Sequence, residues 1–261
     1  MNRNYILNYK TVGNGPVVVM LHGLAGTSQY FDRITKFLPN NKVISIDLLG
    51  FGDSPKPKYI KYTIQDHMSA IENTIESLNL DKPFSVLGVS MGAVLALEFA
   101  KKHPNDIKSV VLVSPAIYSS GVVAKNRIDS TRAPNILMFG PVAKFVCKNI
   151  CARQELAKKI NPIVMRHIPS DVAKTVCEHT WESYSYTMQN VVINQPKQDI
   201  SVITKIPLFI IFDSKDILIE QELMQKLIGK SSAAKIININ GGHGMLVNNT
   251  ALVADTLVHL L

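Results

Sequence analysis

Three residues whose side chains could together perform acyl transfer stand far apart in the chain: Ser90, Asp216 and His243. Ser90 lies in the pentapeptide Gly88-Val89-Ser90-Met91-Gly92, between an apolar run with strand character and an apolar run with helical character. In a G-x-S-x-G turn of this kind, small flanking residues tolerate a strained backbone and the serine hydroxyl is presented as a nucleophile. Such a serine needs a base to accept its proton and an acid to orient that base. The residue types therefore predict attack of Ser90 on a carbonyl carbon, with His243 as the base and Asp216 as the acid.

The pentapeptide alone is weak support, because glycine and serine are common enough for a chance match in about one chain in ten of this length. The positions of the other two candidates strengthen the prediction. Asp216 comes just after the strongly apolar run 208–212, and His243 comes just after the run 236–239. Because the carboxyl ends of parallel strands share one edge of a sheet, residues that each follow a strand can meet there.

The pattern of the whole chain predicts an α/β fold that could supply this sheet. Apolar runs alternate with amphipathic stretches, and several runs are too apolar to face water on either side, which is typical of a parallel sheet covered on both faces. Strands are predicted at 17–21, 43–46, 84–87, 110–113, 208–212 and 236–239, with an edge strand within 4–12. Helices are predicted at 29–38, 64–78, 93–102, 220–228 and from about 250 to the end.

The alternation stops after Ser114-Pro115, and about ninety residues pass before the strand at 208. Helical patterns fill this interval, so we predict a helical insertion that covers the carboxyl edge of the sheet.

The chain resembles a serine hydrolase of the α/β-hydrolase superfamily over essentially its whole length outside the insertion. Besides the pentapeptide, His22-Gly23-Leu24-Ala25-Gly26 is similar to the superfamily's HG loop, and residues 47–54 are similar to its D-x-x-G-x-G-x-S segment. The resemblance implies a mostly parallel central sheet with helices on both faces. It implies a core of residues 1–116 and 204–261 with a helical cap of residues 117–203. It also implies an oxyanion hole made by the backbone N–H groups of Leu24 and Met91.

Two carboxylates compete for the role of the acid, because Asp213 stands where the family usually has glycine, three residues before Asp216. We favour Asp216, since it matches the acid position of the family and Asp213 falls almost on the strand. Among the other histidines, His22 is expected to hold the oxyanion loop.

Composition points to a folded protein, with 46% hydrophobic and 18% charged residues. No apolar run reaches 18 residues and the N-terminus lacks the apolar stretch of a secretory signal, so we expect a cytoplasmic protein without stable membrane insertion. The cysteines are Cys147, Cys151 and Cys177, an odd number without a C-x-x-C pair. We expect buried or free thiols here, and neither a metal site nor a cofactor.

The formal net charge is +8, and twelve lysines and arginines face six acids between residues 115 and 205. These cations alternate with apolar residues at helical spacing, and no basic-aromatic pattern predicts nucleic-acid binding. A solvated basic face is favoured over a surface for an anionic ligand. Docking of an acidic carrier protein is a weaker alternative.

The predicted function is hydrolysis of carboxylic esters or thioesters of small molecules through an acyl-enzyme. A meta-cleavage carbon-carbon hydrolase is the first alternative, although that class typically has an aromatic residue where this chain has Gly244. A non-catalytic ligand receptor on the same fold is the second, because a fold does not fix a function. Neither the natural substrate nor the oligomeric state follows from the sequence.

Overall fold

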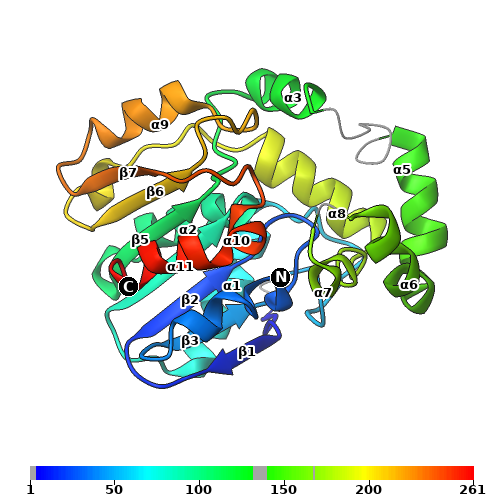
Figure 1. The fold of residues 1–261 in the computed structure, drawn as a ribbon, viewed down its shortest axis with the longest axis horizontal. Coiled ribbons are helices and arrows are strands. Elements are labelled where there is room, and N and C mark those ends of the chain that lie inside the picture. The colour runs from blue at the N-terminus through cyan, green and yellow to red at the C-terminus, as the bar shows by residue number, and fades with distance from the viewer. Residues whose placement is uncertain (1–3, 132–139, 167) are drawn as a thin grey trace.

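The computed structural model describes residues 4–131, 140–166 and 168–261, and its centre is a seven-stranded sheet (Figure 1). The strand order is β1-β3-β2-β4-β5-β6-β7. β1 pairs with β3 in the antiparallel sense, and every other neighbouring pair is parallel. The strands are β1 (Tyr9–Val12), β2 (Val17–Leu21), β3 (Lys42–Ile46), β4 (Phe84–Val89), β5 (Ile107–Val113), β6 (Leu208–Phe212) and β7 (Ala234–Asn238).

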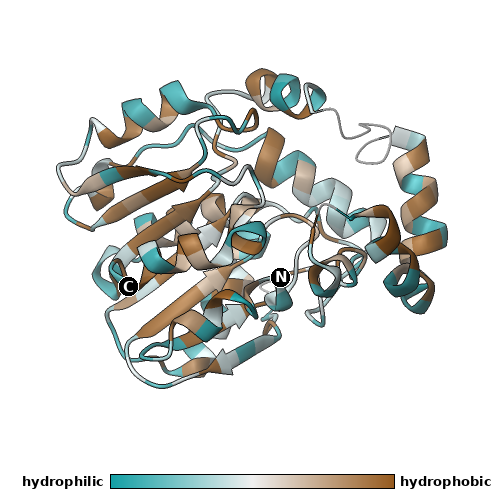
Figure 2. Ribbon diagram, viewed as in Figure 1, coloured by the Kyte–Doolittle hydropathy of each residue, from teal (hydrophilic) through white to brown (hydrophobic). Residues whose placement is uncertain are grey.

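The central strands are buried on both faces, as their apolar runs predict. All five residues of β2 are buried, and their side chains alternate between two hydrophobic cores. Val19 and Leu21 belong to the core on one face, whereas Val18 and Met20 belong to the core on the other. Figure 2 shows the hydrophobic residues concentrated on these strands.

Helices cover both faces of the sheet. One core includes residues of α1 (Ile64–Leu78), α2 (Met91–Lys102) and α9 (Gln221–Ile228). The other core includes residues of α10 (Met245–Asn248) and α11 (Thr250–Val258). This arrangement confirms the predicted α/β-hydrolase fold class, with a mostly parallel sheet between two layers of helices.

Two predicted elements differ from the structure. The helix expected at 29–38 is wrong, because two 3-10 turns, η1 (Ser28–Phe31) and η2 (Ile34–Phe37), occupy this stretch. Ser28, Phe31 and Ile34 are buried at a spacing of three residues, which suits the three residues per turn of a 3-10 helix. The edge strand expected within 4–12 is limited to β1.

Between β5 and β6 the described residues form helices and turns and add no strand to the sheet; we call residues 117–203 the inserted segment. Its longer helices lie to the right of and above the sheet in Figure 1, and α5 and α6 are far from β6 and β7. Whether it is a separate cap domain stays a prediction. Its α-helices are α3 (Gly121–Asp129), α5 (Gly140–Val146), α6 (Gln154–Val164), α7 (Ser170–Ala173) and α8 (Trp181–Thr187). Two π-helical turns, η4 (Cys147–Cys151) and η5 (Met188–Ile193), and the 3-10 turns η3 (Pro104–Asp106) and η6 (Ser201–Ile203) complete the elements.

Among the described residues, no helix has both the length and the apolar character needed to cross a bilayer.

Candidate active site

Ser90 sits at the junction between β4 and α2 with a backbone that few residues adopt, at φ 53° and ψ −114°. The flanking glycines are required by close backbone approach. A Cβ added at Gly88 would collide with the carbonyl of Gly92, and one added at Gly92 would collide with the carbonyl of Leu21. The N–H of Ser90 donates to the carbonyl of Val113 at 2.9 Å, which ties the turn to β5. The pentapeptide therefore forms the sharp strand-to-helix turn that its sequence predicts.

The structure brings the three predicted residues into one chain of hydrogen bonds. His243 Nε2 lies 2.9 Å from Ser90 Oγ, and His243 Nδ1 lies 2.8 Å from Asp216 Oδ2. With Asp216 as a carboxylate, Nδ1 carries the hydrogen and donates to it, so Nε2 is free to accept from the serine hydroxyl. The Asp216 side chain is 3% exposed, whereas that of His243 is 31% exposed, so the buried carboxylate orients a ring whose other edge is accessible.

Asp213, the competing carboxylate, binds the backbone just before His243, whereas the imidazole Nδ1 is hydrogen-bonded to Asp216. Its Oδ2 accepts from the N–H groups of Gly241 and Gly242 at 2.8 Å each, and its Oδ1 accepts from the backbone N–H of Lys215 at 2.8 Å. These N–H donors, that of Gly241 foremost, hold the pKa of Asp213 below its usual range. Asp213 thus fixes the loop that carries the histidine. From the sequence, Asp213 could be identified only as a second candidate for the acid. Its structural role could not be predicted, because its partners are backbone N–H groups, which every residue type except proline carries.

The two residues whose backbone N–H groups are expected to form an oxyanion hole are Leu24 and Met91. Met91 follows Ser90 directly, and Leu24 follows Gly23, which lies close to Ser90. Met91 is the first residue of α2, and the first N–H groups of a helix have no carbonyl partner within it. Leu24 lies inside a turn closed by the N–H of Gly26, which donates to the carbonyl of Gly23 at 3.0 Å. A Cβ added at Gly23 would stand 3.2 Å from the Cβ of Ser90, a tight contact, so glycine suits the close approach of this turn to the serine.

His22 holds that turn in place through a hydrogen bond to its backbone, as expected. Its Nε2 accepts from the N–H of Leu48 at 2.9 Å, so Nδ1 carries the hydrogen and donates to the carbonyl of Gly23 at 2.7 Å. Complete burial lowers the pKa of His22 to about 4, which keeps the imidazole neutral near pH 7. A neutral, fully bonded ring positions the turn and does not act as a base.

The segment 47–54 lies at the same edge of the sheet, where hydrogen bonds to Asp47 hold neighbouring loops together. Asp47 is buried and accepts hydrogen bonds from Ser28 N–H, Asn8 Nδ2 and Asp53 N–H at 2.5, 2.7 and 3.0 Å. Burial alone would raise the pKa of Asp47, but these donors lower it below the usual range. Gly52 has φ +54°, and a Cβ there would collide with the Asp47 carboxylate, which explains the glycine of the motif.

The chain matches the family model described as alpha/beta hydrolase fold over residues 16–250, which include Ser90, Asp216 and His243. It belongs to this α/β-hydrolase family. The match confirms the resemblance inferred from the sequence motifs.

Several curated proteins are similar to this α/β-hydrolase. A probable lysophospholipase of Arabidopsis thaliana, BODYGUARD 4, is 34% identical over 198 residues, which cover 69% of this chain and 46% of the relative. Lipase 1 of Psychrobacter immobilis is 25% identical over 259 residues, covering 95% of this chain and 78% of that lipase. The chain spans about half the length of the first plant relatives that it matches, 46% of BODYGUARD 4 and 58% of BODYGUARD 5.

Solved structures share the fold. An esterase from Exiguobacterium antarcticum superposes with a TM-score of 0.73 at 18% identity, covering 98% of each chain. The enol-lactonase of Burkholderia xenovorans superposes with a TM-score of 0.72 at 18% identity, covering 97% of this chain and 95% of the lactonase.

Proposed function

We propose that the protein is a serine hydrolase that cleaves carboxylic esters or thioesters through an acyl-enzyme. The observation that carries this proposal is the pair of hydrogen bonds that links Ser90 Oγ to His243 Nε2 and His243 Nδ1 to Asp216. A serine next to an imidazole whose other nitrogen is held by a buried carboxylate is arranged for nucleophilic attack. The names of the relatives, which are lipases, esterases and probable lysophospholipases, support the same reaction.

In the first step, His243 Nε2 accepts the Ser90 hydroxyl proton as Oγ bonds to the carbonyl carbon of the substrate. The N–H groups of Leu24 and Met91 donate to the oxyanion, and Asp216 stabilises the imidazolium. The imidazolium then gives its proton to the departing alcohol or thiol, which leaves an acyl group on Ser90. Water, deprotonated by His243, attacks this acyl group and releases the acid with Ser90 restored.

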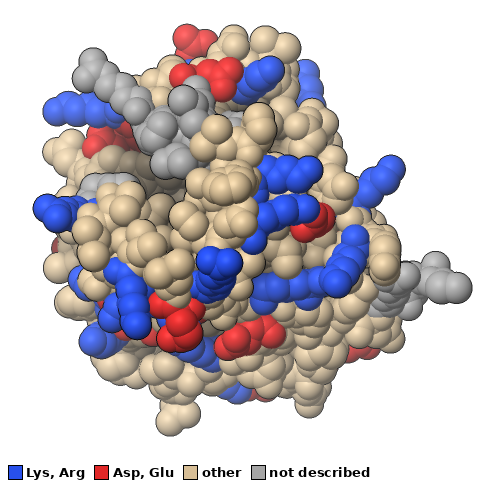
Figure 3. Space-filling view, turned by 90° about the vertical axis from the view of Figure 1, so that its right-hand side faces the viewer, with Lys and Arg blue, Asp and Glu red and all other residues tan. Residues whose placement is uncertain are grey.

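Esters with a long acyl chain are the substrates we propose to test first, since the relatives include lipases and probable lysophospholipases. The inserted segment exposes apolar side chains on α5 and α6, including Phe145 at 66% and Ile163 at 63%. Figure 3 shows several lysine and arginine side chains across the face that contains these helices, with fewer acids among them. An acyl ester with an anionic head or an acidic carrier suits such a face, and its hydrolysis would then fall as salt is raised.

The test is a panel of p-nitrophenyl esters and thioesters of increasing acyl length, run on the wild type and on Ser90→Ala. We expect Ser90→Ala to lose at least about 10⁴-fold in kcat/KM, because the nucleophile is gone while the fold remains. The exposed Ser201, changed to alanine, is the matched control and should keep wild-type turnover. Wild-type-like turnover by Ser90→Ala would contradict the proposal.

The same proteins separate the two alternatives. Fluorophosphonate labelling of Ser90 without turnover of any ester would favour a ligand receptor. Turnover of a meta-cleavage diketone far above that of every ester would favour the carbon-carbon hydrolase. Ester turnover together with labelling is the result that supports the proposal.

A further inference from the structure

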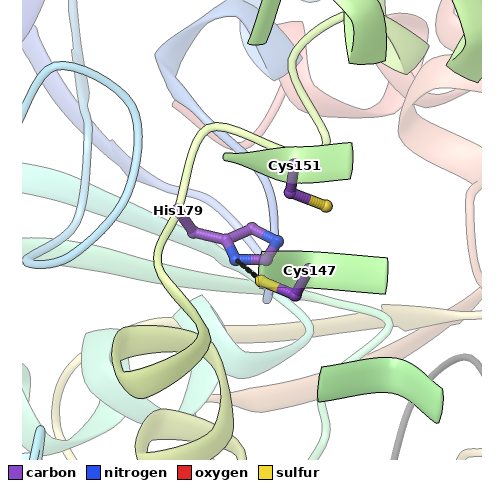
Figure 4. Close-up of side chains that lie close together, drawn as sticks. All are labelled: Cys147, Cys151 and His179. Carbon is purple, nitrogen blue, oxygen red and sulfur yellow. Dashed lines mark hydrogen bonds between the residues drawn. The ribbon is translucent and has the colours of Figure 1, made fainter. Parts of the chain in front are cut away.

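A second group of chemically reactive side chains lies in the inserted segment, away from the serine. Cys147, Cys151 and His179 place one possible ligand atom each within 4.8 Å of the others, and we call these three residues the Cys2His cluster. Cys147 Sγ lies 3.8 Å from His179 Nδ1. Figure 4 shows the His179 ring directed toward the two cysteine side chains. Sequence spacing favours plain thiols here, because His179 comes 28 residues after Cys151 and only the fold brings it to them.

Local structure aims the two cysteines at the same space. Both belong to the π-helical turn η4, in which the N–H of Ala152 donates to the carbonyl of Cys147 at 3.1 Å. Residues four apart in a helical turn lie on one face, so the two sulfurs project together. They point inward, since the cysteines are each 7% exposed and form a small core with Ala157 and Cys177. Such single π-turns occur frequently at functional sites.

The imidazole of His179 is held by neighbours from two elements. Tyr184 of α8 stacks on it with ring centroids 5.0 Å apart and an interplanar angle of 25°, and Phe51 of the core lies 6.0 Å away. Its Nδ1, the nitrogen that lies 3.8 Å from Cys147 Sγ, also lies 3.2 Å from the carbonyl of Thr180, so a metal bound through Nδ1 would replace this backbone contact.

We propose that the Cys2His cluster is a zinc site, in which Cys147, Cys151 and His179 bind Zn²⁺. Tetrahedral zinc has Zn–S distances of about 2.3 Å and Zn–N distances of about 2.0 Å, which place ligand atoms about 3.5–3.8 Å apart. The cluster needs side-chain shifts of only about 1 Å to reach that geometry. Two thiolates and a neutral imidazole are ligands that zinc prefers over harder cations such as Mg²⁺ or Ca²⁺.

Cys177 contacts the thiol of Cys151 and is 8% exposed. It is outside the set of three mutually close atoms, so we assign it a supporting contact to Cys151 and not a bond to the metal.

A metal here would join η4 to the stretch around His179, two parts of the inserted segment, and the second of these parts contacts the core. His179 bridges to Phe51, whose ring lies 5.7 Å from that of His22. The N–H of Gly52 donates to the carbonyl of Glu178 at 2.8 Å. Zinc would therefore stabilise the packing of the inserted segment on the core and would take no part in proton transfer at Ser90.

The first experiment measures zinc in the full chain purified without chelator and then dialysed against a slight excess of Zn²⁺. We expect about one tightly bound zinc per chain and a lower thermal midpoint after chelation, restored by zinc. Replacement by Co²⁺ should give thiolate-to-cobalt charge-transfer absorption together with the strong d–d bands of a tetrahedral site. These readouts do not depend on activity, so they stand whether or not the proposed esterase function holds.

The second experiment compares Cys147→Ser, Cys151→Ser and His179→Asn with Cys177→Ser as the matched control. Each of the first three should lower bound zinc to about a tenth of wild type or less, whereas Cys177→Ser should keep it. Serine at 177 is still a hydrogen-bond donor of similar size, so this variant tests a cysteine of the same core without removing a ligand.

Wild-type protein that takes up no zinc and gives no cobalt–thiolate band would overturn the proposal, even if the variants do not fold. Equal loss of zinc in Cys177→Ser would overturn the assignment of these three ligands. Titration of fewer than three thiols in the denatured, unreduced chain would show a disulfide in place of a metal site.

Discussion

The carboxyl edge of the sheet and the inserted segment are built by different means. At the sheet edge, Ser90, Asp216 and His243 each follow a strand, and backbone hydrogen bonds fix the loops that carry them. In the inserted segment, the described α-helices run from four to eleven residues and two π-turns interrupt them. Its surface also exposes large apolar side chains such as Phe145 and Val164, each 66% exposed.

The difference separates two requirements of the proposed hydrolase activity, which are fixed geometry between the reacting groups and binding of the substrate. The sheet edge sets distances between reacting groups, and it does so with backbone geometry that glycines and buried carboxylates enforce. The inserted segment joins the core through buried apolar residues such as Val191, and through polar contacts, among them Ser183 with Gly50 and Arg33 with Asp171. Bond cleavage should therefore respond sharply to changes at the edge, and stability or substrate affinity should respond to changes at the contacts.

The largest effect is expected from the two carboxylates of the acid loop. Asp216→Asn should lower kcat by about 10⁴-fold, because the amide removes the charge that stabilises the imidazolium and favours the wrong tautomer. Asp213→Asn should lower kcat by about tenfold only, since it weakens the hold on the backbone of residues 241 and 242 and leaves the His243–Asp216 bond. Ester kinetics on both variants make the comparison. Equal losses in kcat would show that the charge of Asp213 contributes to catalysis as much as that of Asp216, and that Asp213 is more than a positioning residue.

The sequence predicted the sheet edge well for a physical reason. Strand, tight turn and helix each impose a local pattern, so Gly88 and Gly92 could be identified as turn residues around Ser90, and Asp216 could be preferred over Asp213. The role of Asp213 escaped prediction, because backbone N–H groups have no sequence signature. The helix expected at 29–38 was wrong because apolar residues three apart suit 3-10 turns as well as an α-helix. His179 beside Cys147 depends on packing between distant segments, which no local pattern records.

Acid should weaken both regions through buried histidines. Burial lowers the pKa of His22 to about 4 and that of His67 to about 3, from 6.5. The unfolded chain binds these protons at higher pH than the folded one, so the stability they confer is complete above pH 6.5 and is lost as pH falls toward 4. Each should account for about 2 kcal/mol between pH 7 and 4.5.

Urea unfolding at the two pH values checks this expectation. His67→Gln should remove about 2 kcal/mol of the pH dependence, whereas the exposed His259→Gln should leave it unchanged. His67 Nε2 lies 3.1 Å from Thr187 Oγ1 of the inserted segment, so this variant also reports on a contact between the two regions. A wild type equally stable at pH 7 and 4.5 would show that neither histidine is held neutral.

A smaller effect is expected where α8 meets the core. The buried Ser183 hydroxyl donates to the carbonyl of Gly50 at 2.8 Å and accepts from the N–H of Thr180 at 3.0 Å. Ser183→Ala leaves both backbone groups without this partner, which should cost about 1–2 kcal/mol in the free energy of unfolding. KM for long-chain esters should rise with little change in kcat. A fall in kcat with KM unchanged would mean that the inserted segment also positions the reacting groups.

The smallest effect is expected at the surface contact between Arg33 and Asp171. Arg33 Nη2 lies 2.7 Å from Asp171 Oδ1 and Nε lies 3.0 Å from Oδ2, a bidentate geometry that would be strong if it were buried. The two side chains are 43% and 53% exposed, however, so water and salt screen the pair and ordering two long side chains offsets much of the attraction. Asp171→Asn should therefore destabilise the protein by about 0.5 kcal/mol at low salt, and by less at high salt, in urea unfolding. Water and salt should leave this exposed pair too weak to hold the inserted segment to the core alone. A loss in unfolding free energy as large as that of Ser183→Ala would therefore contradict this expectation and mean that surface charge, rather than buried hydrogen bonding, holds the segment to the core.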